Sequence, residues 1–335
     1  MGLRFLHYRA LPRLFRRRRL LIIGCGDVGQ RIVALCAKDW RVFGIGRSAS
    51  TLERIRAAGA VPLKADPPHR RLQDLADWVV HSAPPPLDER RQGGGDVDRL
   101  TRRWSARLLD RPRRRSMRAN RKAERPPRRL VYLSTTGVYG DRQGQWTDEV
   151  CAVTPITDRA RRRVDAERCL RDAARRSASL RVTTLRVPGI YAIDRLPIRR
   201  LQDRLPALLP QDDVQTSHIE AEDLARLTRI ALMRGRNQRK LNVVDDSALP
   251  MGEYLDMVAR WAGLPLPPRV DRETLLASVS PMRASFMSES RRLCNLRMKR
   301  ELKLPLRYPT VADFLASHPA PQPAPTPEGP GGAPI

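Results

Sequence analysis

The sequence RLLIIGCGDVG, at residues 19–29, decides the fold of this chain. The aliphatic run LLII predicts a buried strand, and the stretch VGQRIVALCAKD that follows has the spacing of an amphipathic helix. Gly24, Gly26 and Gly29 join the two as a GxGxxG turn. In this setting the first glycine permits a tight turn, the second lets the backbone approach a pyrophosphate, and the third lets helix and strand pack closely.

The start of that helix is where a phosphate group would bind. Free N–H groups and the helix dipole favour an anion at a helix N-terminus. We therefore expect the backbone of Asp27 and Val28 to hold the pyrophosphate of a nicotinamide dinucleotide. The alternative is a glycine-rich turn of an α/β protein that binds nothing.

Outward from this turn, strands and helices alternate along the first half of the chain. Such alternation is typical of the α/β class with a doubly wound parallel sheet, a Rossmann domain. We expect this domain over residues 19–190, interrupted by a basic loop insertion at 110–128 that has too few apolar side chains to be buried. Residues 191–316 predict a smaller, mostly helical, substrate-facing lobe that returns a strand, 240–244, to the sheet. Two terminal segments complete the expected organisation: a basic extension at 1–18 and a disordered Pro/Gly-rich tail at 317–335.

The composition sets limits on partners and compartment. The net charge is +28, but only six of the 64 basic side chains are Lys, and the arginines are spread along the chain without aromatic or zinc-finger patterns beside them. Such an arginine excess is typical of a GC-rich genome, so nucleic acid is not an expected partner. No apolar run is long enough for a membrane span or a signal peptide, and five cysteines without metal-ligand spacing predict reduced thiols in a cytoplasmic protein with no metal site.

The second strand of the predicted sheet ends in a basic side chain. A fold that prefers NAD carries an acidic residue at this place for the ribose hydroxyls. This chain has Arg47 followed by Ser48, eighteen residues after the last glycine of the turn. A guanidinium suits the 2′-phosphate of NADP, so NADP is the expected cofactor, with NAD as the second choice. The alternative is an arginine that is merely solvated.

Four segments together resemble a known family. GCGDVG near the start, HSAPP after the fourth strand, YLSTTGVYGD after the fifth and SHIEAEDLA at 217–225 are similar to the extended short-chain dehydrogenase/reductase group, the NAD-dependent epimerase/dehydratase family. The resemblance covers about residues 19–316. It implies a nicotinamide cofactor and a small-molecule substrate. Because dimers are usual in that family, it also implies a homodimer.

The resemblance assigns roles to several positions. Thr135 matches the catalytic Ser or Thr whose hydroxyl binds the reacting substrate oxygen, although a hydroxyl that only satisfies a turn is the alternative. Four further positions are implied for the cofactor, with ordinary packing as the alternative: Asp66 near the adenine, Ser82 and Ala83 along the cofactor, and Pro188 facing the nicotinamide amide.

The chain also departs from the family pattern. The family carries YxxxK, in which the Lys lowers the pKa of the Tyr that exchanges a proton with substrate. Here the matching positions are Arg159 and Arg163, and a guanidinium with a pKa above about 12 cannot act as a base. The first glycine of the family's GxxGxxG falls on Ile23. Both departures are similar to the atypical branch of the superfamily, and Tyr139 is a candidate for a replacement acid.

The two arginines begin the helix stripe that faces the protein, by the 100° spacing of an α-helix. Like charges at i, i+4 repel, so we expect Arg159 and Arg163 to clamp an anionic substrate or a cofactor phosphate. The alternative is that they pair with carboxylates at the helix start or extend to solvent.

Two functions from different classes remain. The first is an atypical short-chain NAD(P)-dependent oxidoreductase or epimerase, acting on a small, anionic or sugar-nucleotide substrate. The second is a non-catalytic dinucleotide-binding sensor, which would keep the glycine turn and lose the proton-transfer pair. Retention of Thr135 favours the enzyme.

Overall fold

Seven parallel strands form the central sheet of the protein, whose computed structural model describes residues 17–65, 75–85, 95–109, 126–278 and 289–320. In spatial order the strands are β12 (Arg239–Asn242), β7 (Leu180–Val187), β5 (Arg128–Thr135), β4 (Trp78–His81), β1 (Arg19–Ile23), β2 (Arg41–Gly46) and β3 (Val61–Lys64). Asp66 and residues 110–125 of the expected insertion lie outside the described ranges. The insertion's last residue, Arg128, already belongs to β5.

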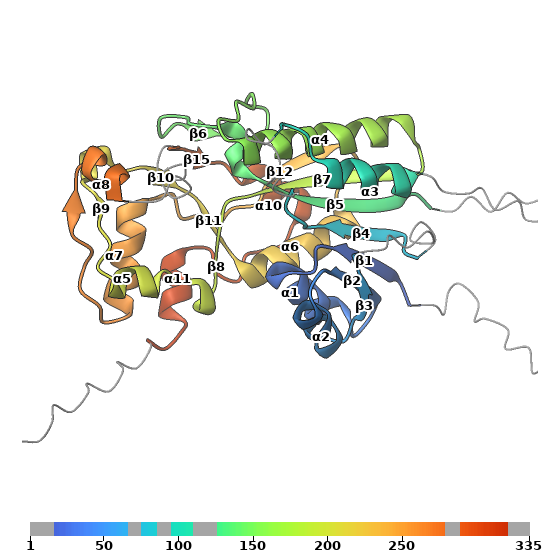
Figure 1. The fold of residues 1–335 in the computed structure, drawn as a ribbon, viewed down its shortest axis with the longest axis horizontal. Coiled ribbons are helices and arrows are strands. Elements are labelled where there is room, and N and C mark those ends of the chain that lie inside the picture. Colours follow the sequence, from blue (N-terminus) through green and yellow to red (C-terminus); the bar gives the residue numbers. More distant parts are fainter. Residues whose placement is uncertain (1–16, 66–74, 86–94, 110–125, 279–288, 321–335) are drawn as a thin grey trace, which may run out of the picture.

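Helices cover both faces of this sheet (Figure 1). One face carries α1 (Asp27–Cys36), α2 (Ala49–Ala57), α6 (Ala221–Arg234) and α10 (Leu296–Leu302), and the other carries α3 (Arg99–Leu109) and α4 (Asp158–Arg176). Along β1 the side chains alternate between two cores, Leu20 and Ile22 in the first and Leu21 and Ile23 in the second. The expected doubly wound α/β class is thus confirmed.

A smaller part of the molecule has its own core. Its helices are α5 (Ile198–Gln202), α7 (Met251–Trp261), α8 (Arg272–Ser278) and α11 (Val311–Ala316), and Tyr191, Leu255 and Phe314 are among the side chains at its centre. Short strand pairs complete it: β9 (Ala207–Leu208) with β14 (Arg269–Val270), and β10 (Gln215–Thr216) with β13 (Leu249–Pro250).

Two further strand pairs connect the parts. The parallel pair β8 (Gly189–Tyr191) and β11 (His218–Glu220) runs between the main sheet and the smaller part (Figure 1). The pair β6 (Trp146–Thr147) and β15 (Arg292–Leu293) brings the C-terminal region back beside the segment that follows β5. Short 3-10 turns lie at η3 (Thr136–Tyr139), η4 (Ile193–Arg195) and η5 (Pro210–Asp212). Within the described ranges, no helix is both long and apolar enough to cross a bilayer.

Candidate functional site

The carboxyl edge of the sheet collects most of the residues that the sequence singled out. Parallel strands end at one edge, and ligands of doubly wound folds bind there, where the strand order reverses. In this sheet β1 stands at the reversal, between β4 and β2. Five groups lie at the ends of successive strands: the glycine turn after β1, Arg47 and Ser48 after β2, Ser82 and Ala83 after β4, Thr135 at the end of β5, and Pro188 after β7.

The first glycine of the turn is required by its surroundings. Gly24 has φ +85°, and a Cβ there would stand 2.4 Å from the backbone nitrogen of Ala83. Ser82 also contacts this turn, because its Oγ donates a hydrogen bond to the Gly24 carbonyl at 2.8 Å. The amides of Ser82 and Ala83 both donate to the Ile23 carbonyl at 2.9 Å. The turn after β1 and the turn after β4 therefore form one rigid unit.

The second glycine leaves an open space at the start of α1. Gly26 is the N-cap of α1 and provides no side-chain cap, and nothing lies within 4 Å of a Cβ placed on it. The first N–H groups of a helix have no intrahelical partner. With Gly26 open in front of them, these groups, among them the amides of Asp27 and Val28, are accessible at the start of α1.

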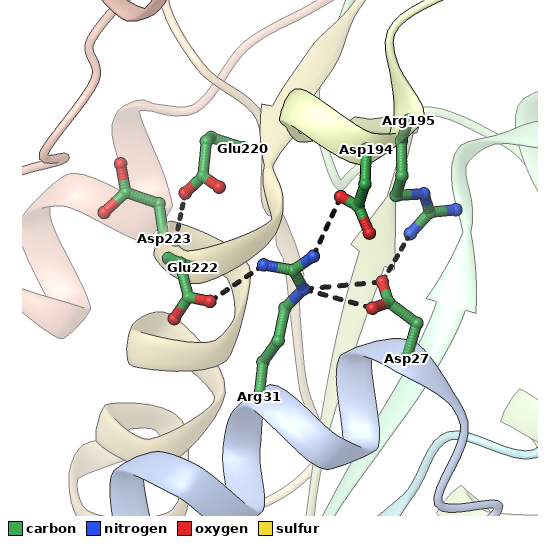
Figure 2. A network of polar contacts seen from close by, with 7 residues as sticks. All are labelled: Asp27, Arg31, Asp194, Arg195, Glu220, Glu222 and Asp223. Carbon is green, nitrogen blue, oxygen red and sulfur yellow. Dashed lines mark hydrogen bonds and ion pairs between the residues drawn. The ribbon is translucent and has the colours of Figure 1, made fainter. Parts of the chain in front are cut away.

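A charged network surrounds this helix start (Figure 2). The Arg31 guanidinium lies 3.3 Å from Asp27, 3.2 Å from Asp194 and 2.8 Å from Glu222. Arg195 also reaches Asp27, at 3.1 Å. The two guanidinium groups offset part of the negative charge of Asp27, although Arg31 is shared with Asp194 and Glu222. They also join α1 to η4 and to the start of α6.

At the end of β2 the two polar residues have different tasks. Ser48 is the N-cap of α2, and its Oγ accepts from the Thr51 amide at 3.2 Å. The Arg47 side chain is exposed. Arg47 is therefore the residue at this position that could meet a ribose phosphate.

Thr135 ends β5 with its side chain half-buried at the sheet edge. Its Oγ1 accepts from the Gly137 amide at 3.3 Å, which leaves its own hydrogen to be donated. Ser134 is buried and donates to Glu167 at 2.7 Å. Of these two hydroxyls, Thr135 is the one at the edge.

Tyr139, the candidate for a replacement acid, lies in the core. Its side chain is completely buried, and its hydroxyl donates to Asn242 Oδ1 at 2.7 Å. The Arg186 guanidinium stands 4.6 Å from the centre of its ring. Burial raises the pKa of Tyr139 to about 12, despite the charge of Arg186. The structure therefore does not bring this hydroxyl together with Thr135 at the sheet edge.

The two arginines of α4 also have different surroundings. Arg163 Nη1 donates to the Leu133 carbonyl at 2.8 Å and to the Tyr132 hydroxyl at 3.1 Å, so it holds the end of β5. Arg159 is exposed; burial of its guanidinium lowers its pKa, and the neighbouring Glu289 carboxylate opposes that shift. Of the two arginines, Arg159 is the more exposed.

Comparisons with known proteins show which solved structures the chain is similar to. No family model matches the chain, and no curated protein matches it. UDP-glucuronic acid 4-epimerase from Bacillus cereus in complex with NAD is 15% identical, with TM-score 0.65 over 89% of this chain and 96% of that one. UDP-N-acetylglucosamine 4-epimerase from Methanobrevibacter ruminantium M1 in complex with UDP-N-acetylmuramic acid is 14% identical, with TM-score 0.64 over 87% and 93%.

A third solved structure is nearer in sequence. It is described as a functionally unknown conserved protein from Silicibacter pomeroyi, and it is 30% identical over 89% of this chain and 97% of that one, with TM-score 0.75. The chain belongs to the same family as that protein. Its fold is that of the extended short-chain dehydrogenase/reductases, as the four sequence segments predicted.

Where the two parts of this dehydrogenase/reductase fold meet, ionisable groups are buried. His218 stacks on Tyr254 with ring centres 4.3 Å apart, and burial lowers the pKa of His218 to about 4. Burial raises the pKa of Asp245 to about 7, opposed by the hydrogen bond that its Oδ1 accepts from the Ser247 amide at 2.9 Å and helped by the charge of Asp246. Burial also raises the pKa of Tyr191 strongly.

Asp245 therefore makes stability depend on pH. The native chain keeps the Asp245 proton up to about pH 7, whereas the unfolded chain releases it near about pH 4, so the wild type loses stability as pH rises through this window. Asp245→Asn has no such loss. The difference in free energy of unfolding between Asp245→Asn and the wild type should therefore be more favourable to the variant at pH 7 than at pH 4. The change should be at least about 1.4 kcal/mol, the value of one unit of pKa shift. Urea denaturation at both pH values measures the difference, and an equal offset at the two would contradict it.

Proposed function

We propose that the chain binds a nicotinamide dinucleotide at the carboxyl edge of its sheet, NADP in preference to NAD. We also propose that it acts as an oxidoreductase or epimerase on a small, anionic or sugar-nucleotide substrate. The observation that supports this proposal is the open start of α1 next to Gly26, at the point where the strand order reverses. Two of the solved structures with this fold are described as sugar-nucleotide epimerases, one of them in complex with NAD. Action in the cytoplasm and assembly as a homodimer stay predictions.

The residues of this edge divide the work of binding and orientation. The amides of Asp27 and Val28 would hold the pyrophosphate, Arg47 the 2′-phosphate, Ser82 and Ala83 the adjoining part of the cofactor, and Pro188 the nicotinamide end. The cofactor supplies hydride transfer. Thr135 donates its hydroxyl hydrogen to the reacting oxygen of the substrate, Arg159 meets an anionic group on the substrate, and Arg163 keeps the end of β5 in place for Thr135.

Arg47 should determine the preference for NADPH over NADH. A charge-assisted bidentate contact is worth about 1.5–3 kcal/mol, and the exposure of Arg47 places the expected effect at the lower end. Arg47→Ala should remove most of the preference while leaving NADH affinity unchanged. Titration of both cofactors by protein fluorescence measures the two affinities. Equal affinities of the wild type for NADPH and NADH would contradict the prediction.

Turnover distinguishes the enzyme from a sensor. We expect the protein with NADP⁺ or NAD⁺ to convert at least one of UDP-glucose, UDP-glucuronic acid and UDP-N-acetylglucosamine, followed by absorbance at 340 nm and by chromatography of the sugar nucleotides. Arginines at both positions of the Tyr/Lys pair favour the second candidate, a non-catalytic sensor. Tight cofactor binding without conversion of any of the three would support the sensor.

A further inference from the structure

The proposed reaction needs a group that accepts and returns a proton, and the family's usual residue is missing. Arg159 and Arg163 cannot act as bases, and the Tyr139 hydroxyl is held by Asn242 inside the core. A carboxylate beside Thr135 would meet the need. Glu289 provides one, from the C-terminal region of the chain and outside every motif discussed above.

Glu289 and Thr135 both lie next to Gly137. A Cβ placed on Gly137 would stand 3.7 Å from Thr135 Oγ1 and 3.8 Å from Glu289 Oε2. The hydroxyl and the carboxylate therefore both border the position of Gly137, just after the end of β5. The charge of Glu289 also acts on the Arg159 guanidinium and raises its pKa against the effect of burial.

The carboxylate is held in this place. Glu289 is only 8% exposed, and Arg291 Nη1 donates to its Oε2 at 2.7 Å and to the Gly140 carbonyl at 2.8 Å. The backbone of the three residues that follow Glu289 is held by hydrogen bonds to other segments. These bonds run from the Ser290 amide to Asp141 Oδ1 at 2.8 Å, from the Arg291 amide to the Gln215 carbonyl at 3.1 Å, and from the Arg292 amide to the Gln145 carbonyl at 3.1 Å.

We propose that Glu289 is the proton-transfer residue of this site, in place of the tyrosine of the family. The inference rests on the proposed function. When a substrate hydroxyl is oxidised, its O–H bond breaks and the proton passes to the Glu289 carboxylate, while the hydride on the same carbon leaves to the oxidised nicotinamide. The products are a carbonyl, the reduced cofactor and a neutral Glu289. Reduction of the carbonyl returns the proton along the same path, with Thr135 bound to the reacting oxygen in both directions.

This position has a consequence that needs no substrate. A carboxylate beside the reacting oxygen also lies near the nicotinamide ring, which is positively charged only when oxidised. Glu289→Gln should therefore weaken NADP⁺ relative to NADPH, changing the ratio of their dissociation constants about 5-fold. Glu289→Asp keeps the charge and should keep the ratio. The matched control is Glu301→Gln, which removes a carboxylate paired with Arg239 at 2.9 Å, at the opposite end of β12.

Turnover gives the second measurement. With a sugar nucleotide that the wild type converts, Glu289→Gln should lower kcat by about 100-fold or more with little change in KM, the usual contribution of a general acid-base group. Glu289→Asp, which keeps the carboxylate, should have a kcat between those of Glu289→Gln and the wild type. If Glu289→Gln does not fold, a lowered kcat in Glu289→Asp tests the role of Glu289 instead.

The outcomes separate the two levels of the proposal. If the wild type binds neither NADP⁺ nor NADPH, the proposed function fails and this inference fails with it. If the wild type binds both and Glu289→Gln leaves their ratio within twofold, or leaves kcat within threefold where turnover exists, the role of Glu289 alone is wrong.

Discussion

Replacing Glu167 by Ala should lower the free energy of unfolding by about 3–5 kcal/mol. Glu167 pairs with Arg186 through two contacts, 3.1 Å from its Nε and 2.8 Å from its Nη2, and the Arg186 side chain is completely buried. Burial alone would lower the pKa of Arg186, but the hydrogen bonds and charge of Glu167 outweigh it and hold this pKa above its usual value. Without Glu167, a buried positive charge and the Ser134 hydroxyl both lose their partner.

The control for this experiment is an ion pair of the same kind at the surface. Asp203 lies 3.8 Å from Arg199, whose side chain is 94% exposed, so Asp203→Ala should cost less than about 0.5 kcal/mol. Chemical denaturation of both variants measures the two values. A loss below about 1 kcal/mol for Glu167→Ala would show that Arg186 finds another partner or water.

Gly26→Ala should abolish cofactor binding in a protein that remains folded. The φ of Gly26 is −79°, which alanine accepts, and nothing lies within 4 Å of the added Cβ, so the free energy of unfolding should change by less than about 0.5 kcal/mol. The same methyl group would stand where the pyrophosphate approaches α1. We expect the affinity for NADPH to fall by about 100-fold or more, the loss of the close backbone approach that the second glycine permits.

Two other glycines make this result specific. Gly95→Ala adds a methyl group where again nothing lies within 4 Å, at a position with no proposed role in cofactor binding, and should leave both stability and NADPH affinity unchanged. Gly24→Ala should instead destabilise the fold, because of its φ of +85° and the 2.4 Å contact with Ala83. Normal NADPH affinity in Gly26→Ala would place the cofactor elsewhere.

The elements that sequence predicted best are those with local signals. The turn at Gly24 combines an aliphatic strand, three spaced glycines and an amphipathic helix within a short stretch, and each part reappears in β1 and α1. The helix expected to carry Arg159 and Arg163 is α4, and Thr157 caps its start by accepting from the Ala160 amide. Such features depend on neighbours in the chain, so a single sequence contains them.

Features that join distant segments could not be predicted in this way. The partners of Arg31 include Asp194 and Glu222, which no spacing rule connects to it. Glu289 is brought next to Gly137 by a segment whose pairing, β15 with β6, joins two strands of two residues each that carry no pattern of their own.

Side-chain direction was a second limit. The α-helical spacing predicted that Arg159 faces the protein, whereas Arg162 is the buried arginine and Arg159 is exposed. Tyr139 stood next to the catalytic motif in sequence, yet η3 turns its ring into the core against Arg186. Proximity along the chain predicted the region of the site in both cases and not the direction of the side chain.

A crystal structure of the protein with bound NADP⁺ would locate the cofactor directly. We expect the pyrophosphate on the amides of Asp27 and Val28 in front of Gly26, and the nicotinamide ring beside Thr135, with the Glu289 carboxylate near it. A complex with the dinucleotide bound away from the start of α1, or with the nicotinamide far from the end of β5, would contradict it.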